Sequence, residues 1–345
     1  MHLLGRVILI CYVSLLAHTV MAQGVVQLPN KIEPPPVDYP RENVSTGYHV
    51  DQSWPKGKSA FAWKAMSSIA IDDQGLIWTV NRGEMPIQVY SADGKLVNQW
   101  GKDHFLTPHQ LVFGSDGHVW IADAHAHAVY KYTRAGERLL TIGIPGEPGD
   151  DDRHLKMPTD MVEGLKGEII VSDGYRNNRV IVFDSQGKFI RKWGELGTKP
   201  GQFSLPHSID RDSQGRVYVA DRNNSRVQVF TPDGKYLTEW VNLCQPWTVR
   251  ITDKDEVYVC GTSPLQWQKE DVMVGIPPKD QIVMKLDTTG RVVSWWGFPK
   301  GPDLADAGAK PGELAWVHGL AVDKKGNLYL GDIMGQRAQK FLIVK

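Results

Sequence analysis

Three histidines stand in similar short stretches of the sequence, each at the start of an apolar segment. The stretches are Pro108-His109-Gln-Leu, Pro206-His207-Ser-Ile and Val317-His318-Gly-Leu. Imidazole is the commonest metal ligand in proteins, and three imidazoles with an open fourth position describe a catalytic zinc site. Copper, iron and nickel also accept such a ligand set. If the fold brings the three side chains together, we expect a bound metal ion, with zinc favoured.

Two arginines and a tyrosine form a second group of candidate functional residues. Arg82 and Arg222 each follow an Asn or Asp at the end of an apolar segment, and Tyr175 lies one step further along in its own segment. Positive neighbours favour a phenolate and lower the pKa of a tyrosine from about 10. Tyr175 beside a metal is therefore a candidate general base. The alternative is that Tyr175 is only a packed aromatic residue.

All of these residues belong to a unit that recurs along the chain. Each copy reads as an apolar-polar strand, an Asp/Gly turn, a second strand ending in Ala-Asp or a similar pair, then a third strand and another Gly turn. The copies begin near Met66, Pro108, Pro158, Pro206, Pro246 and Val317. Six copies with four short strands each predict an all-β, six-bladed β-propeller over residues 48–345.

The last copy ends at Lys345 without a fourth strand, whereas Tyr48–Trp54 resembles a fourth strand with no blade before it. We expect this N-terminal strand to complete the last blade and close the ring, which removes exposed sheet edges.

The residue at the head of each inner strand alternates in a regular way. In order along the chain it is Ser67, His109, Thr159, His207, Trp247 and His318. Alternate blades of a six-bladed ring place equivalent side chains about 120° apart, so these histidines should converge if they face the central channel. A set of aspartates, by contrast, recurs in most copies and is expected to bond turn amides only. Its members are Asp123, Asp173, Asp221 and Asp332.

The first 22 residues have the features of a secretory signal. Arg6 precedes a short apolar run, and Val20-Met21-Ala22 offers small residues ahead of a cleavage site before Gln23. An uncleaved anchor is the alternative, and no later segment is long enough to span a membrane. Residues 23–47 are Pro-rich and read as an extended arm. We expect a secreted or periplasmic protein.

Export bears on the two cysteines that remain after cleavage. Cys244 and Cys260 lie on neighbouring strands of one copy, and an oxidising compartment would permit them to pair. Buried free thiols are the alternative.

The charge balance excludes one class of partner. Lys+Arg and Asp+Glu both number 39, and no block of like charge stands out. Nucleic acid binding is therefore not expected.

The combination of motifs resembles the peptidyl-α-hydroxyglycine α-amidating lyase family, an NHL-repeat, six-bladed propeller that splits peptidyl-α-hydroxyglycine into an amide and glyoxylate. The three histidine stretches resemble the family's zinc-ligand motifs. Ser172-Asp-Gly-Tyr175 resembles the segment of its catalytic tyrosine, and the segments of its two arginines are matched by Asn81-Arg82-Gly83 and Ala220-Asp-Arg222-Asn-Asn. The resemblance extends from about Ala62 to Phe341.

The resemblance implies a small-molecule or peptide-derived substrate and a role for each candidate residue. Zinc on His109, His207 and His318 would polarise the substrate hydroxyl or carry a hydroxide. Tyr175 would accept the hydroxyl proton as the carbon–nitrogen bond breaks. Arg82 and Arg222 would hold the tyrosine and the substrate carboxylate.

The sequence also departs from the family pattern. Gly319 stands where the family has an aspartate that ligates a structural calcium, which argues against that ion although the Leu111 carbonyl could still face it. Trp316 replaces a methionine and would reshape the pocket. Arg176 and Tyr218 stand where the family has cysteines.

Two other functions remain open from the sequence. An exported NHL propeller could be a non-enzymatic scaffold that binds a partner, but it would not need the histidine set, Tyr175 and two arginines. A metal-dependent hydrolase such as a lactonase is the third possibility, since propellers host several chemistries. Such sites usually use carboxylate and Asn ligands for calcium, unlike the histidine-rich set here.

Overall fold

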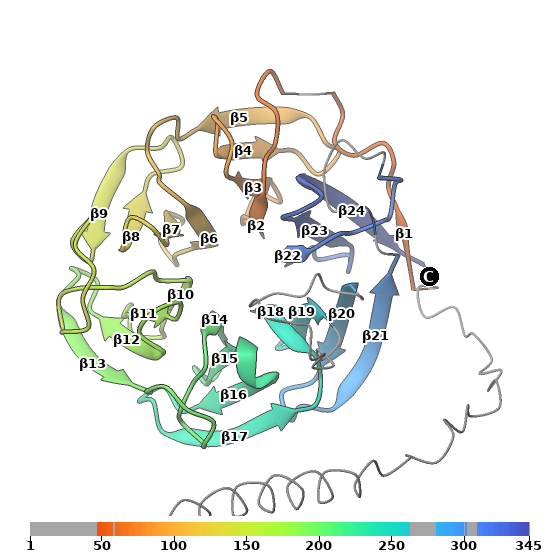
Figure 1. The fold of residues 1–345 in the computed structure, drawn as a ribbon. Coiled ribbons are helices and arrows are strands. Elements are labelled where there is room, and N and C mark those ends of the chain that lie inside the picture. The colour runs from red at the N-terminus through yellow and green to blue at the C-terminus, as the bar shows by residue number, and fades with distance from the viewer. Residues whose placement is uncertain (1–46, 58, 263–280, 300, 302–308, 345) are drawn as a thin grey trace, which may run out of the picture. The chain divides into compact units, whose positions relative to one another are not determined.

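The computed structural model describes residues 47–57, 59–262, 281–299, 301 and 309–344. Its strands form six four-stranded antiparallel sheets arranged around one axis, as Figure 1 shows. The predicted all-β, six-bladed propeller is confirmed. The signal peptide of residues 1–22 and nearly all of the arm of residues 23–47 lie outside the described residues and stay predictions.

Each sheet, or blade, runs from an inner strand at the axis to an outer strand at the rim (Figure 1). Blade one contains β2 (Met66–Ile71), β3 (Ile77–Asn81), β4 (Ile87–Tyr90) and β5 (Leu96–Trp100). Blade two contains β6 (Pro108–Phe113), β7 (Val119–Asp123), β8 (Ala128–Tyr132) and β9 (Arg138–Ile142). Blade three contains β10 (Asp160–Glu163), β11 (Ile169–Asp173), β12 (Arg179–Phe183) and β13 (Phe189–Trp193).

The second half of the ring repeats this order. Blade four contains β14 (Pro206–Arg211), β15 (Val217–Asp221), the 3₁₀ helix η1 (Arg222–Asn224), β16 (Arg226–Phe230) and β17 (Tyr236–Val241). Blade five contains β18 (Gln245–Ile251), β19 (Val257–Thr262), β20 (Gln281–Leu286) and β21 (Val292–Phe298). Blade six contains β22 (Val317–Val322), β23 (Leu328–Asp332), β24 (Arg337–Ile343) and β1 (Tyr48–Val50).

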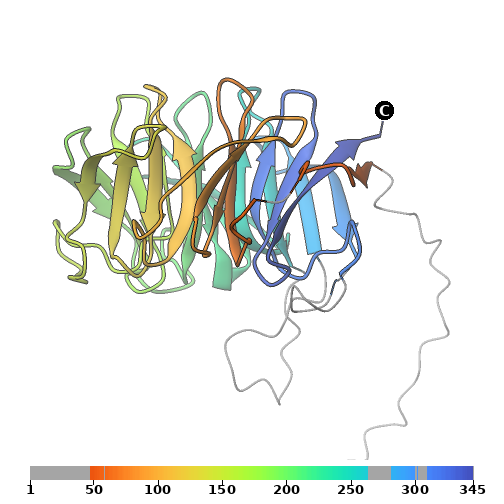
Figure 2. The same cartoon turned by 90° about the horizontal axis from the view of Figure 1, so that it is seen from above.

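The ring closes through the N-terminal strand. β1 pairs antiparallel with β24, so that Tyr48 lies opposite Ile343 and Val50 opposite Phe341. This confirms the expected closure, in which the first and last strands of the propeller share one sheet. Figure 2 shows the same strands from the side, running between the two faces of the ring.

The Asp/Gly turns have a local physical cause. In blade one, the Asp72 carboxylate accepts hydrogen bonds from the amides of Gln74 at 3.0 Å and Leu76 at 2.8 Å. Gly75 then takes a φ of +78°, a conformation that costs glycine little. Asp72 also accepts a hydrogen bond from the Trp78 indole at 3.0 Å, which ties the turn to the core.

The hydrophobic core lies between neighbouring blades rather than at the centre of the ring. One cluster joins Trp78 and Val89 of blade one to Leu111 and Tyr130 of blade two. The outer strand of blade one contributes Trp100, whose ring lies against the turn at Gly136 in blade two. A Cβ on Gly136 would stand 2.8 Å from that ring, so the blade contact itself requires glycine.

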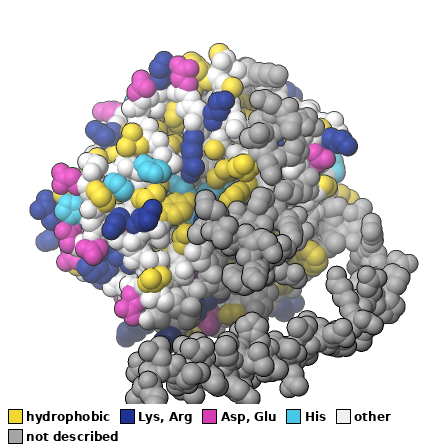
Figure 3. Space-filling model, viewed as in Figure 1, with side chains coloured by type: hydrophobic (Ala, Val, Ile, Leu, Met, Phe, Trp, Pro, Cys, Tyr) yellow, Lys and Arg dark blue, Asp and Glu magenta, His cyan; other side chains and the backbone are white. Residues whose placement is uncertain are grey.

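Within the described residues, no helix has the length and hydrophobicity of a membrane span. On the part of the face coloured by residue type in Figure 3, acidic and basic side chains are interspersed. This mixture agrees with the equal numbers of acidic and basic residues in the sequence.

Candidate active site

The three predicted histidines meet at one end of the axis. His109, His207 and His318 stand at the start of β6, β14 and β22, which are the inner strands of alternate blades. All three are buried, and one ring nitrogen of each lies within 4.8 Å of the others. The ring centroids are 4.8 to 4.9 Å apart. The structure therefore brings together the residues that the blade alternation selects.

The other three blades hold the imidazoles in place through their backbone. The Nδ1 atom of His109 lies 2.5 Å from the carbonyl oxygen of Thr159 in blade three. The Nδ1 atoms of the other two histidines repeat this contact at 2.6 Å, with the carbonyls of Trp247 and Ser67. A carbonyl oxygen only accepts, so each Nδ1 carries the hydrogen and each Nε2 keeps a free lone pair.

Two hydroxyl groups continue this pattern around the ring. The Ser67 hydroxyl donates to the carbonyl of Pro108, and the Thr159 hydroxyl donates to the carbonyl of Pro206, each at 2.9 Å. These bonds fix the backbone directly ahead of His109 and His207. No role was predicted for Ser67 and Thr159, although their alternation with the histidines is visible in the sequence.

Burial sets the charge state of the three histidines. It lowers the pKa of His109 and His207 well below the ordinary value, and the neighbouring imidazole and arginine charges add to this effect. Burial likewise lowers the pKa of His318 to about 3, with Arg82 as the next cause. The rings are thus neutral near pH 7, which is the form that binds a metal.

The lone pairs outnumber the hydrogen-bond donors around them. Tyr175 lies between two of the rings, with its hydroxyl oxygen 2.9 Å from Nε2 of His109 and 3.1 Å from Nε2 of His207. One hydroxyl hydrogen cannot serve both. The Nε2 atom of His318 is buried and has no hydrogen-bond partner among the described residues. Three neutral imidazoles with unsatisfied lone pairs fit a zinc ion.

Tyr175 reaches this position because of the residue before it. A Cβ on Gly174 would overlap the carbonyl oxygen of Pro206, so only glycine lets the turn after β11 pass so close to β14. Burial raises the pKa of Tyr175, and the charges of Arg222 and Arg82 offset only part of that rise. The lowered pKa expected from the sequence is therefore wrong, since burial outweighs the two guanidinium groups.

Arg222 sits on the face of a tryptophan. Its guanidinium carbon lies 3.8 Å from the centroid of the Trp247 ring, a cation–π contact. Trp247 in turn contacts the ring of Trp316, with centroids 4.6 Å apart. The Nε atom of Arg222 is buried without a hydrogen-bond partner in the described part of the chain. Arg82 lies in the turn after β3 and is exposed.

Trp247 was the functional neighbour that sequence reasoning missed. It occupies the histidine-equivalent position of blade five, where the alternating pattern of the odd blades predicts Ser or Thr. That break in the pattern was the signal for its contact with Arg222.

The residues do not fit the calcium ion of the family. Leu111 is buried in β6, but a Cβ on Gly319 would stand 2.9 Å from the backbone nitrogen of Ile69. β22 therefore lies too close to β2 for a carboxylate side chain at this position.

The repeated aspartates have the structural role expected of them. The Asp123 carboxylate accepts hydrogen bonds from the amides of Leu106 at 2.7 Å and Thr107 at 2.8 Å, directly ahead of the His109 strand. Asp332 binds the amides of Ala315 and Trp316 ahead of His318 in the same way.

Of the two alternatives for the cysteines, the structure has free thiols. Cys244 and Cys260 are both buried and unpaired with each other. Burial raises the pKa of Cys260 to about 12, so this thiol is held in its neutral form.

The family models that match the chain describe the same fold as the structure. An NHL repeat model matches residues 203–230, and a model described as a 6-bladed beta-propeller matches residues 151–214. NHL repeat-containing protein 3 of Mus musculus is 31% identical over 314 residues, which cover 86% of this chain and 84% of that protein.

Lyases and amidating enzymes match over shorter stretches. Peptidyl-glycine alpha-amidating monooxygenase A of Xenopus laevis is 39% identical over 162 residues, or 43% of this chain. That stretch is only 17% of the Xenopus protein, so the chain spans a small part of such relatives. A probable peptidyl-alpha-hydroxyglycine alpha-amidating lyase of Caenorhabditis elegans is 29% identical over 221 residues, covering 60% of this chain and 61% of that protein.

Solved structures share the fold at low identity. A streptogramin B lyase superposes with a TM-score of 0.57 and 15% identity, covering 86% of this chain and 98% of that one. A gluconolactonase of Xanthomonas campestris gives a TM-score of 0.57 at 11% identity, covering 86% and 95%. The chain is homologous to peptidyl-α-hydroxyglycine α-amidating lyases, and it belongs to the family of NHL-repeat, six-bladed propellers that includes NHL repeat-containing protein 3.

Proposed function

We propose that this protein is a zinc-dependent lyase that cleaves the carbon–nitrogen bond of a peptidyl-α-hydroxyglycine, or a similar carbinolamide, to give an amide and glyoxylate. The observation that carries the proposal is the convergence of three neutral imidazoles around the hydroxyl of Tyr175. The name of the Caenorhabditis elegans lyase relative contains this substrate, and the name of the Xenopus monooxygenase relative refers to peptide amidation as well.

In this proposal His109, His207 and His318 hold the zinc ion through their Nε2 atoms. A bound zinc ion would polarise the substrate hydroxyl and stabilise negative charge on the oxygen atoms beside it. The Nδ1 contacts with backbone carbonyls keep the rings in the required tautomer and orientation.

Tyr175 moves the proton. It acts as a phenolate, a form that a bound zinc ion would favour together with the charges of Arg222 and Arg82, against the effect of burial. Its oxygen takes the proton of the substrate hydroxyl, and the electrons of that O–H bond form the carbonyl of glyoxylate. The electron pair of the carbon–nitrogen bond stays on the amide nitrogen, which regains a proton from Tyr175. No oxidant or reductant is consumed, and the tyrosine ends in its starting state.

Arg222 binds the carboxylate of the substrate. Its guanidinium is mostly buried, rests on Trp247 and has no carboxylate partner of its own among the described residues. A buried guanidinium of this kind gains most from an external anion with matching geometry. Arg82, which is exposed, also contributes positive charge near Tyr175.

The test combines elemental analysis with an assay of glyoxylate release from a peptide ending in α-hydroxyglycine. The purified protein should contain about one equivalent of zinc and release glyoxylate. Tyr175→Phe should keep the zinc but lose about 10²–10⁴-fold in turnover, because the proton acceptor is gone. Tyr132→Phe, in the core between blades one and two, is the matched control and should stay active. Full activity of Tyr175→Phe would refute the assignment.

A second candidate function is partner binding by an exported propeller without catalysis. NHL repeat-containing protein 3, which matches over 86% of the chain, is named only for its NHL repeats, and this favours the alternative. The same experiment separates the two functions, since a scaffold would contain no stoichiometric zinc and release no glyoxylate. Export itself, with the protein secreted or periplasmic, is part of both proposals.

A further inference from the structure

A buried ion pair lies next to the histidines inside the channel. Arg250, on β18, places its Nη1 atom 2.7 Å from an oxygen of Asp160, which is fully buried at the start of β10. Its Nη2 atom lies 2.8 Å from the side-chain oxygen of Gln110 on β6. The proposed lyase reaction uses none of these three residues.

These contacts place the guanidinium across the axis. Arg250 comes from blade five and Gln110 from blade two, and these blades are opposite each other in a ring of six. Gln110 directly follows His109, and Ser208, which lies 3.0 Å from Nη1 of Arg250, directly follows His207. The guanidinium thus occupies the layer of the channel adjacent to the three imidazoles.

The same network reaches all three histidine-bearing strands. Arg250 contacts β6 through Gln110 and β14 through Ser208. The Gln110 amide then donates to the hydroxyl of Thr248 at 3.2 Å, and that hydroxyl donates to the carbonyl oxygen of His318 at 2.5 Å. Arg250 therefore links the strands of His109 and His207 directly, and the strand of His318 through Gln110 and Thr248.

Every acceptor of the guanidinium is an oxygen atom. The acceptors are the Asp160 carboxylate, the Gln110 amide, the Ser208 hydroxyl and the Val249 carbonyl. Calcium prefers the same kinds of ligand. The carboxylate in this layer belongs to Asp160 of blade three. At the equivalent position of blade six, the close contact of Gly319 with β2 leaves no room for a carboxylate side chain.

We propose that the guanidinium of Arg250 takes the place of the calcium ion implied by the family resemblance, and that this internal cation positions the three histidine strands. Folding and metal binding at the histidines then need no calcium. The proposal rests on the proposed function only in taking the histidines as ligands of one ion.

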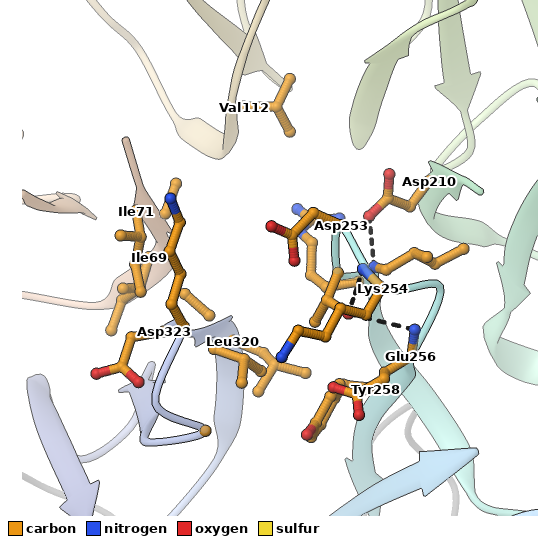
Figure 4. Close-up of a pocket in the computed structure, with 18 of the residues that line it drawn as sticks. Ile69, Ile71, Val112, Asp210, Asp253, Lys254, Glu256, Tyr258, Leu320 and Asp323 are labelled. Atoms are coloured by element: carbon orange, nitrogen blue, oxygen red, sulfur yellow. Dashed lines mark hydrogen bonds between the residues drawn. The ribbon is translucent and has the colours of Figure 1, made fainter. Parts of the chain in front are cut away.

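The physical reason is that a tethered guanidinium stays charged at all ordinary pH values and cannot dissociate from the fold. Breaking a buried pair by removing one partner leaves the other charge uncompensated and is strongly destabilising. Removing Arg250 would expose an oxygen-lined space that calcium can enter. A pocket of about 570 Å³ at the opposite end of the channel leads to it, and Arg250 lies in its lining. Figure 4 shows side chains of this pocket, among them Ile69, Val112 and Asp210.

The first experiment measures the melting temperature in millimolar calcium and in a calcium chelator. The wild type should melt at the same temperature in both. Arg250→Ala should melt lower and should regain several degrees when calcium is added, because an ion that binds only the folded state stabilises it. Arg211→Ala is the matched control, because it removes a neighbouring guanidinium that lies outside the Asp160 network. Any decrease in the melting temperature of this variant should be the same with and without calcium. A calcium-dependent rise for the wild type would overturn the proposal.

The second experiment tests positioning separately from stability. Zinc affinity by competition with a chelating dye, and the visible spectrum of the cobalt-substituted protein, report on the geometry of the histidines. Arg250→Ala should bind zinc about 10–100-fold more weakly and shift the cobalt bands. Added calcium should restore both. Arg250→Lys, which keeps the charge, should lose less. Unchanged affinity and spectrum in Arg250→Ala would overturn the positioning role.

If Arg250→Ala does not fold, the pair Arg250→Met with Asp160→Asn removes both charges together. This variant should fold without calcium and still bind zinc more weakly than the wild type. Wild-type zinc affinity in it would refute the proposal. None of these readouts depends on glyoxylate release, so the lyase proposal can fail while this one stands.

Discussion

The two layers at the histidine end of the channel handle buried polar groups in opposite ways. The first layer holds three neutral imidazoles whose Nε2 lone pairs outnumber the donors around them. The second layer holds formal charges, yet Arg250 and Asp160 are paired with each other and with neighbouring oxygens. Buried polar groups in proteins are normally satisfied. The unsatisfied layer therefore points to an external ligand, and the satisfied layer points to an internal, structural role.

Symmetry separates the two layers as well. In the first layer His109, His207 and His318 repeat the same Nδ1 contact with the next blade, which gives the site a threefold pattern. In the second layer the ring positions carry different residues: Ser68, Gln110, Asp160, Ser208, Thr248 and Gly319. Three equal ligands around the axis suit one central ion. A single arginine side chain instead enters from one blade, and it needs hydrogen-bond acceptors on the blades that face it.

The largest expected effect comes from breaking the threefold layer. His207→Ala should lose bound zinc, and its turnover should fall by about 10³-fold or more, because the metal supplies several kcal/mol of charge stabilisation. Zinc content and glyoxylate release measure the two effects. Its melting temperature without metal should fall less than that of Arg250→Ala, since the ring removed is neutral and the Arg250 network is untouched.

His125→Ala is the control for this substitution, because His125 is exposed and, within the described part of the chain, its ring is hydrogen-bonded only to Thr107 of its own blade. It should retain zinc and activity. A His207→Ala protein with full zinc content would show that the three imidazoles do not share one ion, and the contrast between the two layers would lose its basis.

An intermediate effect is expected when Trp247, which contacts Arg222, is replaced. Trp247→Leu removes the aromatic face under the guanidinium, a contact that contributes up to about 2 kcal/mol in desolvated sites. The KM for the α-hydroxyglycine peptide should rise about 10–30-fold with a smaller change in kcat, because Arg222 binds the substrate carboxylate in the proposed reaction. The zinc content should stay the same, since the Trp247 carbonyl that orients His207 belongs to the backbone.

Trp247→Phe, which keeps an aromatic face, should show a smaller rise in KM. Trp240→Leu, in the core between blades four and five, should lower the melting temperature without raising KM. An unchanged KM in Trp247→Leu would mean that the tryptophan does not position Arg222 for substrate.

The sequence predicted the first layer because that layer follows a rule that operates within each repeat. The ring and its closure depend on alternation and turn residues, and His109, His207 and His318 occupy one register position in every second blade. Equivalent positions in a ring must converge if they face the axis. Burial of Tyr175 was not predictable in this way, because it depends on the packing of turns from neighbouring blades. The sign of its pKa shift was missed for that reason.

The second layer could not be predicted from the sequence either, because its contacts also join different blades. Arg250 pairs with residues two and three blades away, and nothing in the local pattern around β18 specifies those partners. The replacement of an aspartate by Gly319 was visible in the sequence. The close approach of β22 to β2, which excludes a longer side chain there, was not.

The smallest expected effect is a change in the pH dependence of stability, caused by a carboxyl group next to the ion pair. Asp210, on β14, accepts hydrogen bonds from the amides of Ile251 and Arg211, each at 2.8 Å. Burial raises its pKa to about 6, while Arg250 lowers it and Asp160 raises it. Between about pH 4 and pH 6 the folded protein thus binds more protons than the unfolded chain, so the free energy of unfolding falls as the pH rises.

Asp210→Asn should remove this pH-dependent loss. From pH 4 to pH 7, the free energy of unfolding of the wild type should fall by on the order of 2 kcal/mol more than that of the variant, since one pKa unit corresponds to about 1.4 kcal/mol. Urea denaturation at several pH values measures the slope, and Asp253→Asn at the exposed rim is the control. Arg250→Met should enlarge this loss and extend it to higher pH, because the cation that stabilises the ionised Asp210 carboxylate is gone. Parallel pH curves for Asp210→Asn and the wild type would instead place Asp210 outside the influence of the buried layer.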